Sequence, residues 1–209
     1  DCGHCGEGRI PQMSFVLGLT GSIGMGKSTT ARMFADENCD VWDADEAVHR
    51  LYANGGAAVG PMAQAFPTAI VGGAVSRERL KEIIADDPTA LQRIERIVHP
   101  LVAEDRARFI AASRADIVVL DIPLLFETGA QGPFDAIACV TVAPEIQRQR
   151  VMARGTMTQA QFEAIRDKQM PADEKCRRSD YVITTETLED ARQQVQGLVR
   201  TIRSRQSHA

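Results

Sequence analysis

A short glycine-rich segment constrains the fold of this chain more than any other feature of its sequence. The segment Gly21-Ser-Ile-Gly24-Met-Gly26-Lys27-Ser28 matches the pattern G-x-x-x-x-G-K-[ST]. Its glycines allow successive backbone N–H groups to turn towards a phosphate, and a following helix adds the positive end of its dipole. An apolar run at 15–19 precedes the segment, and a stretch with helical spacing at 28–36 follows it. This is the context that the pattern requires, so we predict a phosphate-binding loop.

The residue types in the loop assign roles towards a nucleotide. Lys27 would reach the β- and γ-phosphates, and the Ser28 hydroxyl would ligate Mg²⁺. The alternative interpretation is a glycine-rich turn with a solvated lysine, but motif and context agree on the first interpretation. The predicted nucleotide-binding residues are Gly21, Ser22, Ile23, Gly24, Met25, Gly26, Lys27, Ser28, Thr29 and Arg150.

Apolar runs bounded by polar residues or glycine recur along the chain, at 15–19, 41–42, 117–122, 136–142 and 181–183. Between them lie stretches with helical spacing, whose apolar faces consist of Leu91, Ile94, Val98, Leu101 and Val102, and of Leu188, Ala191, Val195, Leu198 and Ile202. Continuous apolar strands that alternate with helices indicate a parallel sheet covered on both faces. We predict an α/β fold of the P-loop NTPase type, with three αβα layers around a five-stranded parallel sheet.

One interval interrupts this alternation. Residues 55–115 contain no convincing strand, and the pairs Gly55-Gly56 and Gly72-Gly73 are interpreted as turns between helices. We therefore predict a single domain at 13–209, with a core at 13–54 and 116–209, a helical insert at 55–115 and a helical lid at about 148–178. Residues 1–12 stand apart, because their Cys2-x-x-Cys5 pair around His4 lacks further metal ligands. We interpret them as a leader or leftover segment.

The composition excludes several classes of protein. Hydrophobic residues make up 44% and charged residues 25%, and the net charge is −4, which argues against bulk attraction to nucleic acid or an anionic membrane. No window of 18 apolar residues predicts a transmembrane span, and the N-terminus lacks an apolar secretory core, so we expect a cytoplasmic location. The five scattered cysteines are expected to be reduced thiols rather than a disulfide framework.

A phosphate-binding loop indicates a nucleotide but not a reaction. The Asp-x-x-Gly segment and the Asn-Lys-x-Asp guanine reader that are typical of GTPase switches are both absent from the sequence. With 209 residues, the chain is also too short for a motor or transporter ATPase with coupling elements. A small-molecule kinase that uses ATP and Mg²⁺ is the size class that remains.

Carboxylates end the second and third predicted strands. Asp43 and Asp45 follow an apolar run at the sheet edge where ligands bind. One aspartate would accept a proton from the attacking hydroxyl and the other would cap the next helix; spacing supports both roles equally, and we assign catalysis to Asp45. Asp121 ends the third strand as a Walker B aspartate would, and it either helps to hold Mg²⁺ or caps the strand end. Glu127 would equally fit a solvated helix residue.

The segment 148–178 is rich in positive charge, with eight basic residues against four acidic ones. Phosphoryl transfer needs mobile positive charge near the transferred group, and a helical lid would also exclude water. Most of these side chains are expected on a solvated helix face. Arg154, followed by Gly155 at a helix end, is the best candidate for a phosphate contact.

Five motifs together resemble one enzyme family. They are Gly18-Leu-Thr-Gly-Ser-Ile-Gly-Met-Gly-Lys-Ser-Thr, Asp43-Ala-Asp45, Ile97-Val-His99-Pro100-Leu-Val, Pro123-Leu-Leu-Phe-Glu127, and Arg154 followed by Gln169 and Ser179-Asp180-Tyr-Val-Ile183. The first is shared by many kinases, whereas the His-Pro-Leu-Val and Pro-Leu-Leu-Phe-Glu runs are more particular. In this order and spacing, residues 13 to about 200 resemble the dephospho-CoA kinases.

The resemblance implies ATP-dependent phosphorylation of the ribose 3′-hydroxyl of dephospho-CoA to give coenzyme A, the last step of CoA biosynthesis. It implies that Asp45 is the general base and that Lys27 and Arg154 contact phosphates. ATP and dephospho-CoA would be the two small-molecule substrates, with no obligatory protein partner evident.

The implied acceptor site lies beside the helical insert and consists of Asp45, His99, Pro123, Leu124 and Leu125. From sequence alone, His99 would more often be a capping or core histidine. The resemblance gives His99 proximity to the acceptor but no role in proton transfer.

The sequence departs from the family pattern at two places. Ser22 and Met25 stand where glycine and serine are common, and neither supplies an essential side chain. Thr184-Thr185 stands where the family usually has Asp-Asn near the adenine, so the resemblance does not assign the adenine contact. A contact through the backbone is favoured over a changed base preference.

Two other functions are compatible with the loop. A nucleoside monophosphate kinase would need an arginine for the acceptor phosphate, and Arg77, Arg79 or Arg93 in the insert would serve. A nucleotide-binding regulator without turnover would not need the set of Lys27, Ser28, Asp45 and Arg154.

Overall fold

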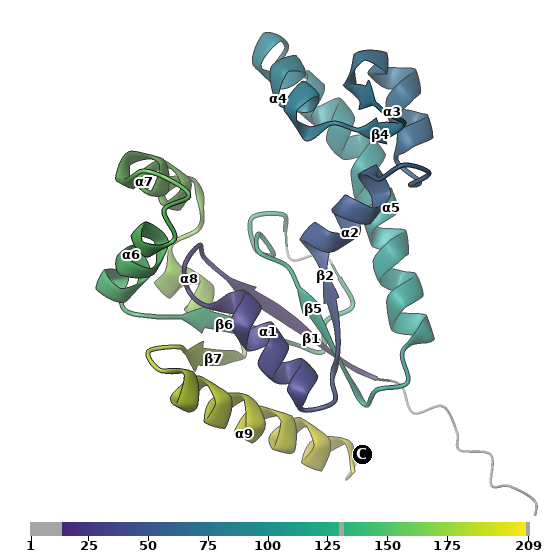
Figure 1. The fold of residues 1–209 in the computed structure, drawn as a ribbon. Helices are drawn as coiled ribbons and strands as arrows, with labels where there is room; N and C mark the ends of the chain where they lie inside the picture. Colours follow the sequence, from purple (N-terminus) through teal and green to yellow (C-terminus); the bar gives the residue numbers. More distant parts are fainter. Residues whose placement is uncertain (1–13, 130–131, 208–209) are drawn as a thin grey trace, which may run out of the picture. The chain divides into compact units, whose positions relative to one another are not determined.

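The computed structural model describes residues 14–129 and 132–207 (Figure 1). The chain forms two compact units. The first comprises the described parts of Asp1–Val41, Ser113–Val119 and Leu124–Ala209, and the second comprises Trp42–Ala112 and Leu120–Pro123. The segment 1–12, with its Cys2 and Cys5, lies outside the described residues.

The predicted five-stranded parallel sheet is confirmed. Its strands, in the order β2-β5-β1-β6-β7, are Asp40–Asp43, Ile117–Asp121, Phe15–Gly21, Ala136–Thr141 and Tyr181–Thr184. Strand β6 pairs in parallel with both β1 and β7, with Leu19 opposite Ala138 and Val140 opposite Ile183. All residues of β5 are buried, as a strand covered on both faces requires. The α/β class predicted from the alternation of apolar runs and helical stretches is therefore correct.

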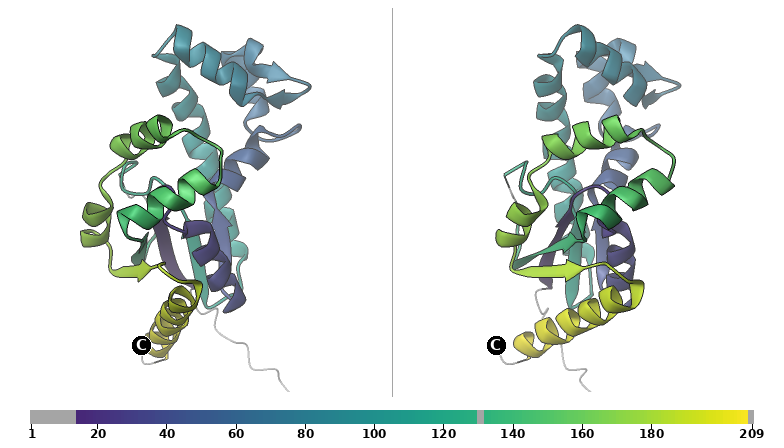
Figure 2. Two further views of the ribbon diagram at one scale, coloured as in Figure 1. Left: turned by 60° about the vertical axis from the view of Figure 1, so that its left-hand side comes forward. Right: turned by 90° about the vertical axis from the view of Figure 1, so that its left-hand side faces the viewer.

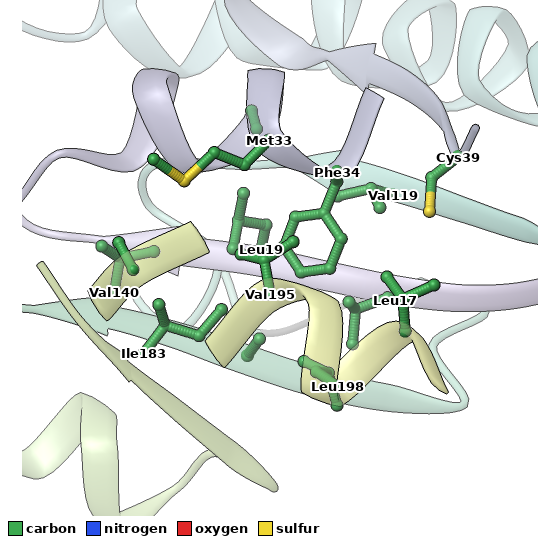
Figure 3. Close-up of a cluster of buried hydrophobic side chains, with 14 of the residues drawn as sticks. Leu17, Leu19, Met33, Phe34, Cys39, Val119, Val140, Ile183, Val195 and Leu198 are labelled. Carbon is green, nitrogen blue, oxygen red and sulfur yellow. The ribbon is translucent and has the colours of Figure 1, made fainter. Parts of the chain in front are cut away.

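Two helices of the first unit pack side by side on the sheet, α1 (Lys27–Asp36) and α9 (Leu188–Gln206). Figure 3 shows Phe34 of α1 and Val195 of α9 meeting Leu19 of β1 in one buried cluster. The predicted apolar face of α9 is buried from Ala191 to Ile202, but Leu188 is 70% exposed. Leu188 is exposed because it starts the helix at its Thr187 cap, beyond the part that packs on the sheet.

Three further helices follow one another between β6 and β7: α6 (Pro144–Ala153), α7 (Gln159–Lys168) and α8 (Ala172–Arg177) (Figure 2, green). Helix α6 ends before Gly155, whose φ of 63° lies in the left-handed region that favours glycine. A capping box between Thr158 and Gln161 starts α7. These helices occupy the segment in which the sequence predicts a basic helical lid.

The second unit has a hydrophobic cluster of its own, which includes Leu51, Met62, Phe66, Leu80 and Ile94. Its elements are α2 (Ala44–Tyr52), α3 (Val59–Ala65), η1 (Pro67–Ala69), β3 (Ile70–Val71), β4 (Ala74–Val75), α4 (Arg77–Asp86) and α5 (Ala90–Ala112). No helix among those described is long and apolar enough to cross a bilayer.

Two details of the second unit differ from the sequence predictions. Gly72 and Gly73 join the antiparallel strands β3 and β4, not two helices, and their φ values of 58° and 80° suit a tight hairpin turn. Each strand has only two residues, too few to produce a recognisable apolar pattern. On α5, Ile94 and Val98 are buried as predicted, whereas Leu91 is 44% exposed and is replaced in the core by Ala90.

Candidate active site

The glycine-rich loop joins β1 to α1, which confirms the predicted strand–loop–helix context. Gly24 and Gly26 adopt φ values of 77° and 89°, in the left-handed region that favours glycine. A Cβ on Gly24 would lie 2.5 Å from Cγ2 of Val151 in α6, so this position excludes a side chain on steric grounds as well. The loop conformation thus depends on the glycines that the motif specifies.

The N-terminus of α1 is open towards a ligand. Gly26 is its N-cap and has no side chain to accept a hydrogen bond from the first turn. The leading N–H groups of a helix lack partners within the helix and carry the positive end of its dipole. Ser28 and Thr29 are exposed in this first turn, directly after Lys27. Such an arrangement suits an anionic group such as a phosphate.

The peptide groups around Ile23 are fixed by two glutamines. The Ile23 N–H donates to Oε1 of Gln169 at 3.3 Å, and the Ile23 carbonyl accepts from Nε2 of Gln147 at 2.7 Å. Gln147 lies on α6 and Gln169 follows α7. The sequence assigns no contact to Gln169, although this residue belongs to the motif that resembles the family, and Gln147 carries no recognisable signal in the sequence.

Met25 fastens the loop to the core. Its side chain is 3% exposed and belongs to the main buried cluster, and its sulfur accepts a hydrogen bond from the N–H of Val142 at 3.2 Å. Ser22 is also buried, at 7% exposure. Ser22 and Met25, the two loop residues that depart from the family pattern, therefore differ in role. Met25 contributes its side chain to the packing of the core as well as its backbone to the loop.

Thr185 and Arg150 meet behind the loop. The Thr185 hydroxyl donates to the carbonyl of Met25 at 2.7 Å and accepts from Nη1 of Arg150 at 2.9 Å. Arg150 Nη2 also donates to the carbonyls of Thr185 and Glu186. The sequence placed Arg150 among the nucleotide-binding residues but left the neighbourhood of Thr185 unassigned.

A cavity of about 250 Å³ borders this cluster. It brings together Gly26, Thr29 and Arg150, which the sequence predicts for nucleotide binding, with Arg154, the predicted phosphate contact, and Leu188. Arg154 is exposed and is the C-cap of α6. A larger cavity of about 1260 Å³ is lined by residues of α6, α7 and α8, together with Ser22 and Gln169.

The carboxylates after β2 have separate local roles. Asp43 is the N-cap of α2, because its Oδ1 accepts from the N–H groups of Asp45 at 2.7 Å and Glu46 at 3.0 Å. Asp45 lies exposed in the first turn of α2. Sequence spacing left open which of the two aspartates caps α2, and in the structure Asp43 is the cap.

The other residues predicted for the acceptor and the metal differ in exposure. His99 is exposed on α5, and Asp121, the last residue of β5, is 1% exposed. Leu124 is 42% exposed, whereas Leu125 is buried at 1% and approaches Gly18 so closely that a Cβ there would lie 3.0 Å from its Cδ1. Asp45, His99, Asp121 and Pro123 belong to the second compact unit, and Leu124 and Leu125 belong to the first.

Glu127 is not the solvated residue that the sequence allowed. Its Oε1 lies 2.8 Å from the Lys175 ammonium and accepts a hydrogen bond from the Met170 N–H at 2.9 Å. Lys175 is fully buried on α8, an exception to the predicted solvated face. Burial raises the pKa of Glu127, but Lys175 and the Met170 N–H lower it more, so the pKa lies below its ordinary value.

The residues predicted for Mg²⁺ have the donor chemistry that this ion prefers. Among residues 14–129 and 132–207, no three His, Cys, Asp or Glu side chains gather as a metal-binding group. Mg²⁺ bound with a nucleotide needs no such cage, because phosphates and water supply most of its oxygen ligands. An exposed hydroxyl such as that of Ser28 and a carboxylate such as that of Asp121 fit this mode of binding.

Comparisons with known proteins give the family. The sequence model of dephospho-CoA kinases matches residues 15–190. The dephospho-CoA kinase of Ruegeria pomeroyi is 68% identical over 197 residues, which are 94% of this chain and 100% of the relative. A Thermus thermophilus crystal structure superposes with a TM-score of 0.80 at 31% identity, over 90% of this chain and 97% of that one. The Campylobacter jejuni dephospho-CoA kinase shares the fold, with a TM-score of 0.64 at 21% identity over 90% and 96%. The chain belongs to the dephospho-CoA kinase family.

Proposed function

We propose that this chain transfers the γ-phosphoryl group of ATP to the ribose 3′-hydroxyl of dephospho-CoA and so forms coenzyme A in the last step of its biosynthesis. The observation that carries the proposal is the open N-terminus of α1, next to a cavity lined by Arg150 and Arg154, in a chain of this family. A kinase needs this combination, because it must hold a triphosphate and neutralise its charge.

The proposed transfer is direct and in line. The loop and Lys27 hold the phosphates of ATP, and Arg154 contributes positive charge near the transferred group. Asp45 accepts the proton of the 3′-hydroxyl while the ribose oxygen bonds to the γ-phosphorus and the bond to the β–γ bridging oxygen breaks. ADP leaves, and no covalent enzyme intermediate forms. Positioning supplies most of the rate in such a reaction.

The acceptor is proposed to lie against the elements that carry His99, Pro123 and Leu124. Leu125 is buried, and its proposed role is to support its neighbour Leu124 from the core of the first unit. Ser28 and Asp121 are proposed to hold Mg²⁺, which supplies charge neutralisation on the phosphates when it is bound. We further propose that the enzyme acts in the cytoplasm and needs no partner beyond its substrates.

The test is ADP release by the purified chain with ATP, Mg²⁺ and one acceptor at a time. We expect rapid ADP formation with dephospho-CoA, and a product that is heavier by one phosphate and carries it on the 3′ position by phosphorus NMR. AMP, CMP and water are the parallel acceptors. Turnover with AMP or CMP instead would make the chain a nucleoside monophosphate kinase. Tight ATP binding without turnover of any acceptor would make it a nucleotide-binding regulator.

A further inference from the structure

Thr185 occupies an unusual position for a small polar residue. It directly follows β7, and only 6% of its surface is exposed. Its N–H donates to the carbonyl of Thr141 at 2.9 Å, so its backbone continues the pairing of β7 with β6. Its side chain is therefore held at a fixed place in the first unit.

The Thr185 hydroxyl connects two parts of the nucleotide site. A hydroxyl has one hydrogen to donate, and here it points to the Met25 carbonyl in the phosphate-binding loop. The oxygen accepts from Nη1 of Arg150 on α6. Loop and arginine thus share a single buried group, and each of these hydrogen bonds fixes the direction of the other.

The contact with the loop is close as well as polar. A Cβ added to Gly26 would lie 3.1 Å from Oγ1 of Thr185, so the loop backbone passes directly over this residue. Gly26 immediately precedes Lys27, the first residue of α1. Thr185 therefore lies against the loop at the residue where α1 and its exposed N–H groups begin.

The arginine is held by its edge. Arg150 donates to the Thr185 hydroxyl and to the carbonyls of Thr185 and Glu186, through N–H groups that lie in the plane of the guanidinium. An arginine held in this way retains its flat face for stacking on a planar ring. The cavity beside it is also lined by Thr29 and by the exposed, apolar Leu188, which suits the ring of a nucleobase.

We propose that Thr185 is a positioning residue for ATP, which couples the phosphate-binding loop to Arg150 through its hydroxyl and thereby fixes the arginine that stacks on the adenine. The inference rests on the proposed nucleotide site, but not on the identity of the acceptor. The Thr185 hydroxyl has no further hydrogen to donate to a base edge. Its loss therefore weakens the binding of ATP and GTP by the same factor.

The test is calorimetric binding of ATP and of GTP to full-length variants without acceptor. Thr185→Val keeps the shape but removes the hydroxyl, and we expect Kd for ATP to rise about tenfold, the scale of a lost buried hydrogen bond. Thr185→Ser restores the hydroxyl and should restore Kd. In turnover assays the same change should appear in KM for ATP, with kcat within about twofold of the parent, because Thr185 does not touch the reacting atoms.

Three comparisons separate this role from general destabilisation. Thr201→Val removes an exposed hydroxyl that bonds Gly197 within α9, and it should leave Kd unchanged. Arg150→Met should raise Kd at least as much as Thr185→Val, and adding Thr185→Val to it should raise Kd by less than Thr185→Val does alone, because the two substitutions share the contact between Arg150 and the hydroxyl. If Thr185→Val fails to fold, Thr185→Ser and Arg150→Met carry the test: Arg150→Met must raise Kd while Thr185→Ser keeps it.

Unchanged ATP affinity in a folded Thr185→Val protein would overturn the proposal, as would additive effects of the two substitutions. A loss of affinity for ATP but not for GTP would show that Thr185 reads the base edge, which also contradicts it. None of these binding outcomes depends on dephospho-CoA turnover. A failure of the proposed function would be seen separately, as wild-type ATP binding without acceptor-dependent ADP release.

Discussion

Asp43 and Asp45 stand two positions apart, yet only Asp43 has its side chain bound to the backbone. Its carboxylate accepts the N–H groups of Asp45 and Glu46, and its own dihedral angles, φ −109° and ψ 124°, are those of an N-cap. Sequence spacing supports either aspartate as the cap, because the choice depends on which residue first adopts helical angles. The position at which β2 ends determines which aspartate is the cap, and the pattern of residue types does not encode this position.

For Asp45→Asn we expect kcat to fall about 100-fold or more, the usual contribution of a general base, with little change in KM for ATP. The substitution is nearly isosteric at an exposed position, so the thermal midpoint should stay unchanged. Steady-state kinetics with dephospho-CoA measure the effect. Glu46→Gln, which removes the neighbouring exposed carboxylate, is the matched control and should keep wild-type kcat. A wild-type kcat in Asp45→Asn would remove Asp45 from the role of base.

At the scale of secondary-structure elements, the long apolar runs predicted the strands of the main sheet well. The two-residue strands and the ends of the helix faces were predicted poorly. The five strands of the sheet were found because each buries a continuous run. The β3–β4 hairpin was missed because two residues per strand carry no periodicity. Leu91 and Leu188 belong to the predicted apolar faces but are exposed, because helical spacing gives the face of a helix but not how far the packing extends along it.

One ion pair joins two elements that the sequence did not connect. Lys175 of α8 is fully buried against Glu127, which lies in the turns after β5 and is 18% exposed. We expect Lys175→Met to lower the free energy of unfolding by about 3 kcal/mol, because it leaves a buried carboxylate without its partner. The double substitution Glu127→Gln/Lys175→Met should cost less than Lys175→Met alone. Urea denaturation at pH 7 measures both, and equal or additive losses would contradict the coupling.

The same pair has a defined pH dependence. The pKa of Glu127 lies below its ordinary value of 4.5, so its contribution to stability is complete above about pH 4.5. It is lost as the pH falls through the lower pKa of the folded state. The stability difference between the wild type and the double variant should therefore shrink in this acidic range.

At the scale of the whole molecule, the fold and the phosphate-binding loop were predictable, but the contacts that fix the loop were not. Gln147, Gln169 and Thr185 reach Ile23 and Met25 from 124, 146 and 160 positions away along the chain. Each is a single polar residue without periodicity, and the motif that contains Gln169 does not say which atom it contacts. The pairing of such residues is decided by the packing of α6, of the segment after α7 and of β7, which a local pattern does not contain.

Polar contacts of Arg203 attach α9 to the rest of the first unit. Arg203 of α9 forms an ion pair with Asp116 and donates to the carbonyl of Glu37 at 3.0 Å. Both charged side chains are more than one-third exposed, so we expect Arg203→Met to cost at most about 1 kcal/mol in the free energy of unfolding. Chemical denaturation measures it, with Arg200→Met on the exposed part of α9 as the control. A loss above 3 kcal/mol would mean that Arg203 supports the core rather than the surface.

The bond from Thr185 to the Met25 carbonyl has a consequence for protein synthesis. The two residues are 160 positions apart, so the glycine loop leaves the ribosome long before the threonine that secures it. Strand β6, which pairs with β1, is likewise made late. Domains fold as units during translation, and this one is incomplete until β7 emerges. A nascent chain that lacks β7 therefore has no finished pocket for ATP, and the ligand can stabilise only a chain in which β7 has already been made.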